Sequence, residues 1–535
     1  MKFKKITSVI LAVALIFSVT TVPAVAREDV TNSFAQKGYI FLDKIISGLV
    51  SGISAMIATP RWPQKSEFKS ENFYPGYAKD EYKLEAGEDD CWNIGYSNAS
   101  ILTGNEVGGD GDYYVGGSLS ITKKLATSQL DDQKVRTIAI SDGRGISIFS
   151  AIDCFGFSST DVKVIRKMFA EYAESEGLDI VSINISALHQ HSCVDTFGMN
   201  GDIIDALFFS SFRTLTGQEL PGGKNKDYMN NLYKVTFNTM KEAVNNMEAG
   251  SLYYGSVDVS DYIRDKRDPQ VYDKNMNRFR FVPFDETSKE IWIANAGIHC
   301  VGHGAGGTDL TGDYPYYMEK YINENYDADL FYILGAQLAI TSKGDALNLD
   351  PELDASDETY SMRMLGERFA QLMNSIDNEV EVEPIFNISY TQTFVEIENK
   401  IFILAAKGGL LSADVYKDGL FKTVVATEVG YAEFGKDIAV SIIPGELAPE
   451  IAFGGAETAE TSWYGKDWEY PSFQSLTPEK KLIVFGLTND QIGYLLTSNN
   501  WHSILTENEE IVSCGQHAGE TITQAYIDLI KEIKG

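Results

Sequence analysis

The stretch Ser186-Ala187-Leu188-His189-Gln190-His191-Ser192 carries two of the six histidines in the chain. It follows an apolar segment, 178–185, whose alternating pattern is typical of a β-strand. Two more histidines, His299 and His303, form a second short cluster. Because imidazole is the commonest metal ligand in proteins and carries protons near neutral pH, this clustering points to a metal or catalytic site.

A strand–helix–strand unit contains this stretch. A strand, a crossover helix and another strand of such lengths are typical of a parallel pair, and ligands bind beyond the carboxyl ends of parallel strands. His189 and His191 stand at that position. The expected strands are 135–141, 146–154 and 178–187, and the expected helix is 159–175, with Ser159 or Thr160 as its N-cap.

The rest of the pattern predicts an α/β fold, with mixed β-sheets in layers flanked by helices. Strand 290–296 leads to His299, and strands 437–443 and 482–487 lead to turns that carry Glu446 and Tyr494. Residues from 380 onward are expected to be largely strands. Further strands are expected at 251–259, 278–283 and 329–338, and helices at 203–215, 228–247, 358–376 and 518–533.

Length and composition describe a large globular protein of 535 residues, of which 44% are hydrophobic. The formal net charge of −31 repels nucleic acid, so we exclude a nucleic-acid partner. The five cysteines show neither zinc-finger spacing nor a dense disulfide framework. Cys193 and Cys300 each follow a clustered histidine closely, and the sequence leaves open whether they form a disulfide or stay as buried thiols.

The N-terminus has the pattern of a secretory signal. Three lysines among the first five residues precede the apolar run 6–22, and Ala24-Val25-Ala26 fits a small-residue cleavage site. A membrane anchor is the alternative, but the run is short for a span. We therefore expect residues 1–26 to be a signal peptide, a mature chain that starts at Arg27, and a protein that is secreted or at the extracellular surface.

Residues 27–65 form an N-terminal segment with apolar residues at helical spacing in its central part, 34–58. Two hypotheses fit this pattern. The segment is either an amphipathic helix that lies on a membrane surface or a helix that packs on the main domain. Residues 66–535 show no internal repeat and no long linker, so we expect one large α/β unit.

Four segments share one design, in which an apolar strand, a sharp turn and a polar group follow one another. Two histidines and one carboxylate with an open position are a common catalytic zinc set, and such a zinc activates water and polarises a carbonyl. No H-E-x-x-H helix is present. The pattern alone leaves a metal site and structural histidines as alternatives. The polar groups are His189 with His191, His299, Glu446 and Tyr494.

These segments resemble the neutral ceramidase family, the non-lysosomal amidases that cleave ceramide. The order of the family's short motifs is preserved across roughly residues 75–535, and Asp313 follows His299 at about the family's spacing. Leu188-His189-Gln190-His191-Ser192-Cys193 resembles the family motif T-H-T-H-S-G, and Ile443-Pro444-Gly445-Glu446 resembles L-P-G-E. Gly493-Tyr494 resembles G-Y (or S-Y), and Gly515-Gln516-His517-Ala518-Gly519-Glu520 resembles A-P-G-A-G-E.

The resemblance implies a neutral-ceramidase-like catalytic domain and a secreted, zinc-dependent hydrolase that cleaves an N-acyl lipid such as ceramide to a sphingoid base and a fatty acid. It implies that His191 orients the substrate or stabilises the developing oxyanion. It places an arginine near the scissile amide, for which we favour Arg267 in the segment 264–267. The implied Zn²⁺ ligands are His189, His299, Glu446 and Tyr494.

The sequence also departs from the family pattern. Ala339 stands where the family has an active-site serine, and Thr506 stands where it has a second active-site tyrosine. No segment matches the C-terminal immunoglobulin-like domain of many members, so we expect a divergent member without it. The alternatives are a zinc hydrolase of another amide or ester and a non-catalytic lipid- or surface-binding protein on the same fold.

Overall fold

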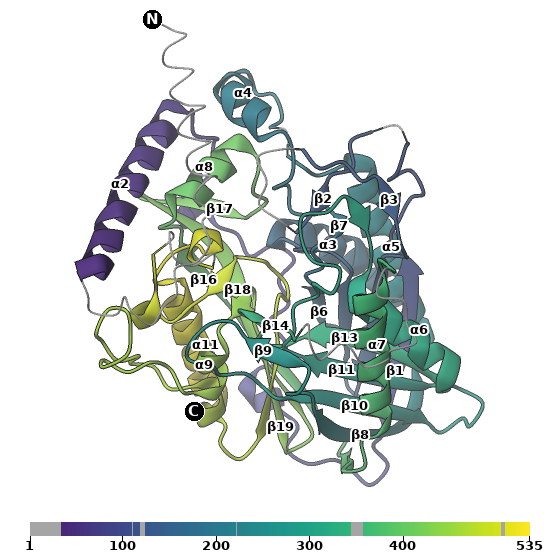
Figure 1. Ribbon diagram of the computed structural model, residues 1–535. Helices are drawn as coiled ribbons and strands as arrows, with labels where there is room; N and C mark the ends of the chain where they lie inside the picture. The colour runs from purple at the N-terminus through teal and green to yellow at the C-terminus, as the bar shows by residue number, and fades with distance from the viewer. Residues whose placement is uncertain (1–33, 110, 118–122, 221, 344–356, 504–508) are drawn as a thin grey trace, which may run out of the picture.

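Two β-sheets lie face to face at the centre of the molecule, and helices cover the outer face of each sheet (Figure 1). This computed structural model describes residues 34–109, 111–117, 123–220, 222–343, 357–503 and 509–535. The predicted signal peptide and Thr506 lie outside the described residues. The layered architecture of mixed sheets confirms the predicted fold class.

The larger sheet has nine strands and contains the predicted parallel crossover. Strands β5 (Ile146–Ile152) and β6 (Ile180–Ala187) pair in parallel, and helix α3 (Ser159–Glu176) connects them in the sequence. The remaining strands are β1 (Trp92–Ser100), β4 (Lys134–Ser141), β8 (Glu248–Asp258), β10 (Asn275–Pro283), β11 (Glu290–Ala296), β13 (Ala328–Leu334) and β15 (Val380–Val382). The order is β13-β11-β10-β8-β1-β4-β5-β6, with β15 beside β8.

The smaller sheet packs its inner face on the larger one. Phe434 lies 4.8 Å from Phe279 between ring centroids, and Phe485 lies 5.9 Å from Phe149. The sheet consists of β16 (Phe386–Glu396), β17 (Val415–Asp418), β18 (Lys422–Phe434), β19 (Ile438–Ile442) and β21 (Lys481–Phe485). Its order is β16-β18-β19-β21, with β17 beside β18. The predicted strands 437–443 and 482–487 are confirmed as β19 and β21, but the region after residue 380 also contains α8 (Lys400–Gly408), α9 (Pro449–Phe453) and α10 (Phe473–Leu476), which the sequence pattern missed.

Amphipathic helices complete the outer layers. On the outer face of the smaller sheet, Tyr526 of α11 packs 6.4 Å from Tyr431 between ring centroids. The aromatic-rich helix α6 begins at a proline-containing turn, and the sequence pattern missed it. The helices beside the larger sheet are α3, α5 (Lys226–Asn245), α6 (Asp313–Asn325) and α7 (Tyr360–Asn374), and the helix beside the smaller sheet is α11 (Ala518–Lys534).

Three helices form a separate apolar cluster beside the sheets. They are α2 (Phe34–Met56), α4 (Ile203–Thr216) and α8 (Lys400–Gly408). Val50 and Ile53 of α2 are buried together with Leu207 and Leu404, as the packed-helix hypothesis expects. The opposite face of α2 stays exposed. Within the described residues, Gln36–Met56 is the one helix that is long and apolar enough to cross a membrane by length and composition.

Backbone hydrogen bonds join the carboxyl ends of strands in the two sheets. Ala187 N donates to Leu487 O over 3.1 Å, and Asn489 N donates to Ile185 O over 2.7 Å. Gly486 N donates to Leu334 O over 2.9 Å. The loops after β6, β13 and β21 therefore leave the sheets at one common edge.

A buried ion cluster lies below this edge. Arg136 on β4 is fully buried, with Nη1 2.9 Å from Asp153 Oδ1 and Nη2 2.7 Å from Glu319 Oε2. Asp153 also accepts a 2.8 Å hydrogen bond from Gln190 Nε2. Gln190 stands between His189 and His191, so the cluster fixes the loop that carries both histidines.

We predict that Arg136→Met lowers the free energy of unfolding by about 3–5 kcal/mol, because it leaves two buried carboxylates without their main partner. Urea denaturation followed by circular dichroism measures the change. Lys289→Met is the control, because it breaks a surface contact of 3.9 Å with Asp329 and should cost less than about 1 kcal/mol. Equal effects of the two substitutions would contradict a structural role for the cluster.

Candidate metal centre

His189 lies directly beyond β6 in the left-handed backbone region, with φ 55°. Its Nδ1 lies 2.7 Å from the carbonyl oxygen of Phe155, and the Phe155 ring stacks on the imidazole at 4.5 Å between centroids. A ring N–H on Nδ1 donates to that carbonyl, which leaves the lone pair on Nε2 available to a metal.

His299 follows β11 and is held in the same way. Its Nδ1 lies 2.9 Å from the carbonyl oxygen of Ile340, and its backbone N–H donates to the same oxygen over 3.1 Å. The lone pair of this imidazole is therefore also on Nε2. Asp313 accepts hydrogen bonds of 3.0 Å from the backbone N–H groups of Gly302 and His303, which fixes the loop after His299.

Glu446 and Tyr494 are neighbours on two short parallel strands. These are β20 (Glu446–Leu447) and β22 (Tyr494–Leu495), and Glu446 pairs directly with Tyr494. A glycine precedes each residue, and a Cβ on Gly445 would lie 2.6 Å from Gly493 O. The close approach that places Glu446 beside Tyr494 therefore requires glycine at position 445.

The four predicted ligands converge. His189 Nε2 and His299 Nε2 each lie 3.1 Å from Glu446 Oε2, and Tyr494 OH lies 3.4 Å from His299 Nε2. With metal–donor distances of about 2.0–2.2 Å, tetrahedral zinc ligands lie roughly 3.3–3.6 Å apart. The spacing of the four donors is close to that of a tetrahedral zinc site.

The hydrogen-bond geometry of these atoms also fits a shared ion. Although they lie 3.1 Å apart, neither His189 Nε2 nor Glu446 Oε2 has a partner in hydrogen-bond geometry among the described residues. Buried polar atoms without partners are rare, and a bound cation is one of their ordinary explanations. The donor set of two imidazoles and a carboxylate, with a phenol beside them, suits zinc.

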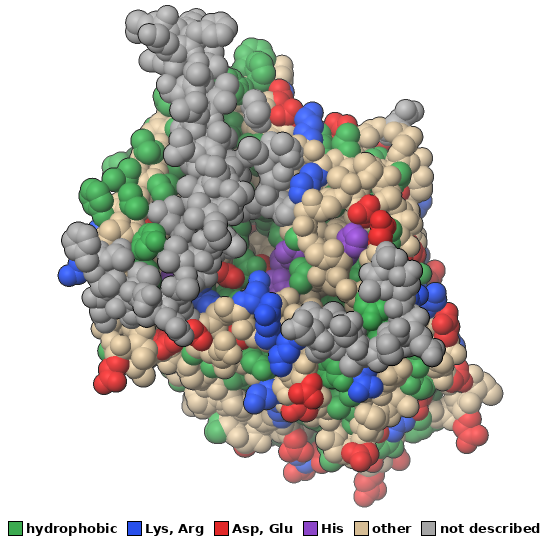
Figure 2. Space-filling model, viewed as in Figure 1, with side chains coloured by type: hydrophobic (Ala, Val, Ile, Leu, Met, Phe, Trp, Pro, Cys, Tyr) green, Lys and Arg blue, Asp and Glu red, His purple; other side chains and the backbone are tan. Residues whose placement is uncertain are grey.

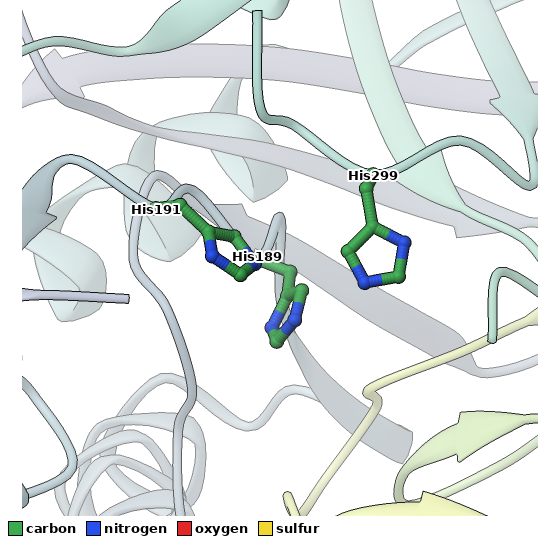
Figure 3. Close-up of side chains that lie close together, drawn as sticks. All are labelled: His189, His191 and His299. Atoms are coloured by element: carbon green, nitrogen blue, oxygen red, sulfur yellow. The ribbon is translucent and has the colours of Figure 1, made fainter. Parts of the chain in front are cut away.

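Nitrogen atoms of His189, His191 and His299 all lie within 4.8 Å of one another (Figure 3). His189 and His299 each contact Glu446 at 3.1 Å, whereas His191 makes no contact with Glu446 within 4.0 Å. Burial lowers the pKa of His191 well below its usual value, and the neighbouring imidazoles act in the same direction. A neutral His191 carries one N–H donor and one acceptor, so it suits contact with a substrate better than a place among the ligands.

Burial and charge set the protonation states of the ligands. Burial raises the pKa of Glu446, but His189 and His299 outweigh it and hold the carboxyl ionised, with a pKa far below its usual value. Burial lowers the pKa of His299 and outweighs the opposing effect of Glu446. Burial raises the pKa of Tyr494 well above 10, so its side chain is a neutral phenol.

A cavity of about 440 Å³ opens above these residues. Figure 2 shows histidine at the bottom of a hollow, with lysine and arginine side chains gathered at its edge. One part of the cavity wall is apolar, and the other part is polar and includes Lys266 and Thr341. The apolar residues include Phe155, Phe197, Met199, Phe402, Ile511 and Val512.

Comparison with known proteins gives a fold but no close relative. No protein-family model matches the sequence, and no curated protein matches it. The structure is similar to neutral ceramidase from Pseudomonas aeruginosa, with a TM-score of 0.60 and 14% identity over 83% of this chain and 74% of that chain. A ceramidase complexed with C2 gives a TM-score of 0.59 and 14% identity over 83% and 76% of the two chains.

The chain has the neutral ceramidase fold. The resemblance inferred from short, ordered sequence motifs is therefore confirmed at the level of the fold, and the low identity fits a divergent example.

Two positions separate this chain from the expected neutral ceramidase pattern. Ala339 is buried, with φ 61°, and its methyl group offers neither the donor nor the acceptor that a serine would provide. Arg267 lies in a buried ion pair, with Nη2 2.7 Å from Glu510 Oε1. Arg267 thus pairs with Glu510. Lys266, a residue that the sequence pattern did not single out, lies in the cavity wall.

The fourth clustered histidine and two nearby cysteines have other surroundings. His303 lies 3.2 Å from Asp309, away from the four converging ligands. Cys193 and Cys300 are both free and buried, so the thiol alternative is correct. Burial raises the pKa of both thiols well above the usual value, which keeps them protonated.

We predict that Gly445→Ala separates Glu446 from Tyr494 and weakens zinc binding at least tenfold, because the added methyl group meets the backbone of Gly493. Zinc affinity by competition with a chromophoric chelator measures the effect. Gly52→Ala is the control, because its new methyl group meets no atom within 4 Å. Unchanged zinc affinity in Gly445→Ala would show that the pairing of the two short strands does not shape the site.

Proposed function

We propose that the protein is a secreted, zinc-dependent amide hydrolase that cleaves an N-acyl lipid such as ceramide. The observation that carries this proposal is the convergence of His189, His299, Glu446 and Tyr494 at the base of a partly apolar cavity. The neutral ceramidase fold supports the same reaction class, and the signal pattern in residues 1–26 supports export.

The residues of the site have different roles in amide hydrolysis. Zinc, when bound, supplies Lewis-acid polarisation of the carbonyl and activation of water. Glu446 and the two ligand histidines hold the ion, and their second contacts to Phe155 and Ile340 fix the imidazole tautomers. Neutral His191 is placed to donate a hydrogen bond to the developing oxyanion or to orient the amide.

The apolar wall of the cavity suits the acyl chain of the substrate. Phe402 of α8 and Ile511, which are far apart in the sequence, both contribute to this wall. Burial of aliphatic carbons against such side chains contributes about 0.8 kcal/mol for each methylene group. We therefore expect affinity to rise with acyl chain length until the wall is covered.

We further propose that α2 brings the protein to a membrane surface. Phe41 and Leu49 on the outer face of α2 are 63% and 61% exposed, while the inner face packs on α8. Helix α4 packs on α8 as well, and its Phe212 and Leu215 are 58% and 80% exposed. Since α8 also supplies Phe402 to the cavity, the exposed helices stand beside the route that a lipid substrate would take.

His299→Ala and Glu446→Gln should each lose zinc and activity and still fold, because each removes one donor from the converging set. Metal analysis of the purified protein and hydrolysis of a fluorescent ceramide measure the two effects. His517→Ala is the control, because that histidine is exposed and pairs with Glu398. A full equivalent of zinc in His299→Ala would overturn the site assignment and the mechanism with it.

Zinc binding without turnover of any N-acyl lipid would favour the alternative of a non-catalytic lipid- or surface-binding protein. Turnover of other amides or esters alone would favour a zinc hydrolase with a different substrate. Ala339 in place of the family serine is the specific feature that gives weight to both alternatives.

The double substitution Phe41→Asp and Leu49→Asp should reduce binding to phosphatidylcholine vesicles at least tenfold, because two exposed apolar side chains lose their favourable transfer from water. Co-sedimentation with the vesicles measures the binding. Phe421→Asp changes an apolar residue that is 94% exposed in another part of the surface and should leave binding unchanged. Equal binding by both variants would show that α2 does not contact the membrane.

A further inference from the structure

At the edge of the cavity, two cations have no carboxylate partner among the residues that the structure describes. Strand β9 (Ile263–Asp265) pairs antiparallel with β14 (Ile340–Ser342), and Arg264 lies directly opposite Thr341. Directly opposed residues point to the same side of a sheet, and Thr341 lines the cavity. Arg264 therefore lies on the cavity side of this strand pair.

Lys266 lies on the same side. Exposure alternates along this segment, with Arg264 and Lys266 exposed and Asp265 and Arg267 buried. Residues two apart on an extended chain share a face, and Lys266 itself lines the cavity. Lysine and arginine atoms are visible at this edge of the hollow in Figure 2.

The acidic residues nearby do not neutralise these charges. Glu509 also lines the cavity, but it lies 3.8 Å from Arg267, which Glu510 holds in a buried pair. Glu446 faces the two ligand histidines. No carboxylate among the described residues lies within ion-pair distance of Arg264 or Lys266. In a chain with a net charge of −31, two cations beside the site that pair with no described carboxylate are a specific feature.

We propose that the amine half of the substrate carries an anionic group, such as a carboxylate, that Lys266 and Arg264 bind. This inference rests on the amide hydrolase function proposed above. Among N-acyl amides, it favours N-acyl amino acids and related anionic substrates over the uncharged ceramide. The acyl chain lies along the apolar wall, the amide lies above the ligands, and the anion meets the cations at the edge.

The charges of the products agree with this assignment. Hydrolysis breaks the C–N bond, adds the oxygen of one water to the acyl carbon and leaves a fatty acid and an amine that takes up a proton. A sphingoid base would then carry a net positive charge next to Lys266, whereas an amino acid keeps its carboxylate. A bidentate or paired contact from arginine and lysine is a common way to bind such a group.

Two soluble substrates with the same acyl chain test the inference, namely N-octanoylglycine and N-octanoylethanolamine. The zinc-loaded full chain is assayed without vesicles, and amine release gives kcat/KM for each. We expect at least a fivefold preference for the glycine conjugate at low salt, and we expect this preference to shrink as added salt screens the cations.

Lys266→Glu should invert the preference, and Lys266→Met should give an intermediate ratio. The side chain is exposed, so both variants should fold, which circular dichroism checks. Lys320→Glu on the outer side of α6 makes the same change of charge away from the cavity and should keep the ratio of the unsubstituted protein. An unchanged ratio in Lys266→Glu would overturn the inference and leave the hydrolase function intact.

Two further outcomes are decisive. A preference that arises only when both substrates are presented on anionic vesicles would overturn the inference, because the cations would then contact lipid headgroups. If neither amide is hydrolysed, the proposed function fails, and calorimetric binding of N-octanoylglycine decides the site separately. At least fivefold weaker binding by Lys266→Glu would then support an anion site, and equal binding would exclude it.

Discussion

The hydrogen bonds that join the strand ends of the two sheets are the constraint on which the candidate site depends. Asn489 takes part with both its backbone and its side chain, since its Oδ1 accepts from Ile185 N over 2.9 Å and its N–H donates to Ile185 O over 2.7 Å. These contacts place the loop after β21 against the end of β6. His189 follows β6 and Tyr494 follows β21, so their side chains meet only because these two strand ends are joined.

Several residues at this edge adopt the left-handed conformation without being glycine. They include His189, Ala339, Leu487 and Asn489, with φ between 51° and 66°. Each such residue costs of the order of 1 kcal/mol or more, and strain of this kind collects at functional sites. The surrounding hydrogen bonds and the buried Arg136 cluster offset this cost, since they hold Gln190 and the strand ends in one arrangement.

The sequence predicted that His189, His299, Glu446 and Tyr494 would lie together because each of them follows a strongly patterned strand. The strand before His189 was expected to end at Ala187, and β6 ends there. Local reasoning gives no guidance where tertiary contacts decide the outcome. Nothing local distinguishes Arg267, which pairs with Glu510 from a distant segment, from Lys266, which faces the cavity. Helix α8 was hidden in an apolar run that also suits a strand, and its packing on α2 settles its form.

The joined edge also has a kinetic consequence. The four converging residues are spread from position 189 to position 494, and they come from both sheets. Contacts between such distant segments form late in folding, because closing long loops costs entropy before any contact stabilises them. The arrangement of these four residues therefore does not exist until the two sheets have docked, so the candidate site is completed at the end of folding rather than at its start.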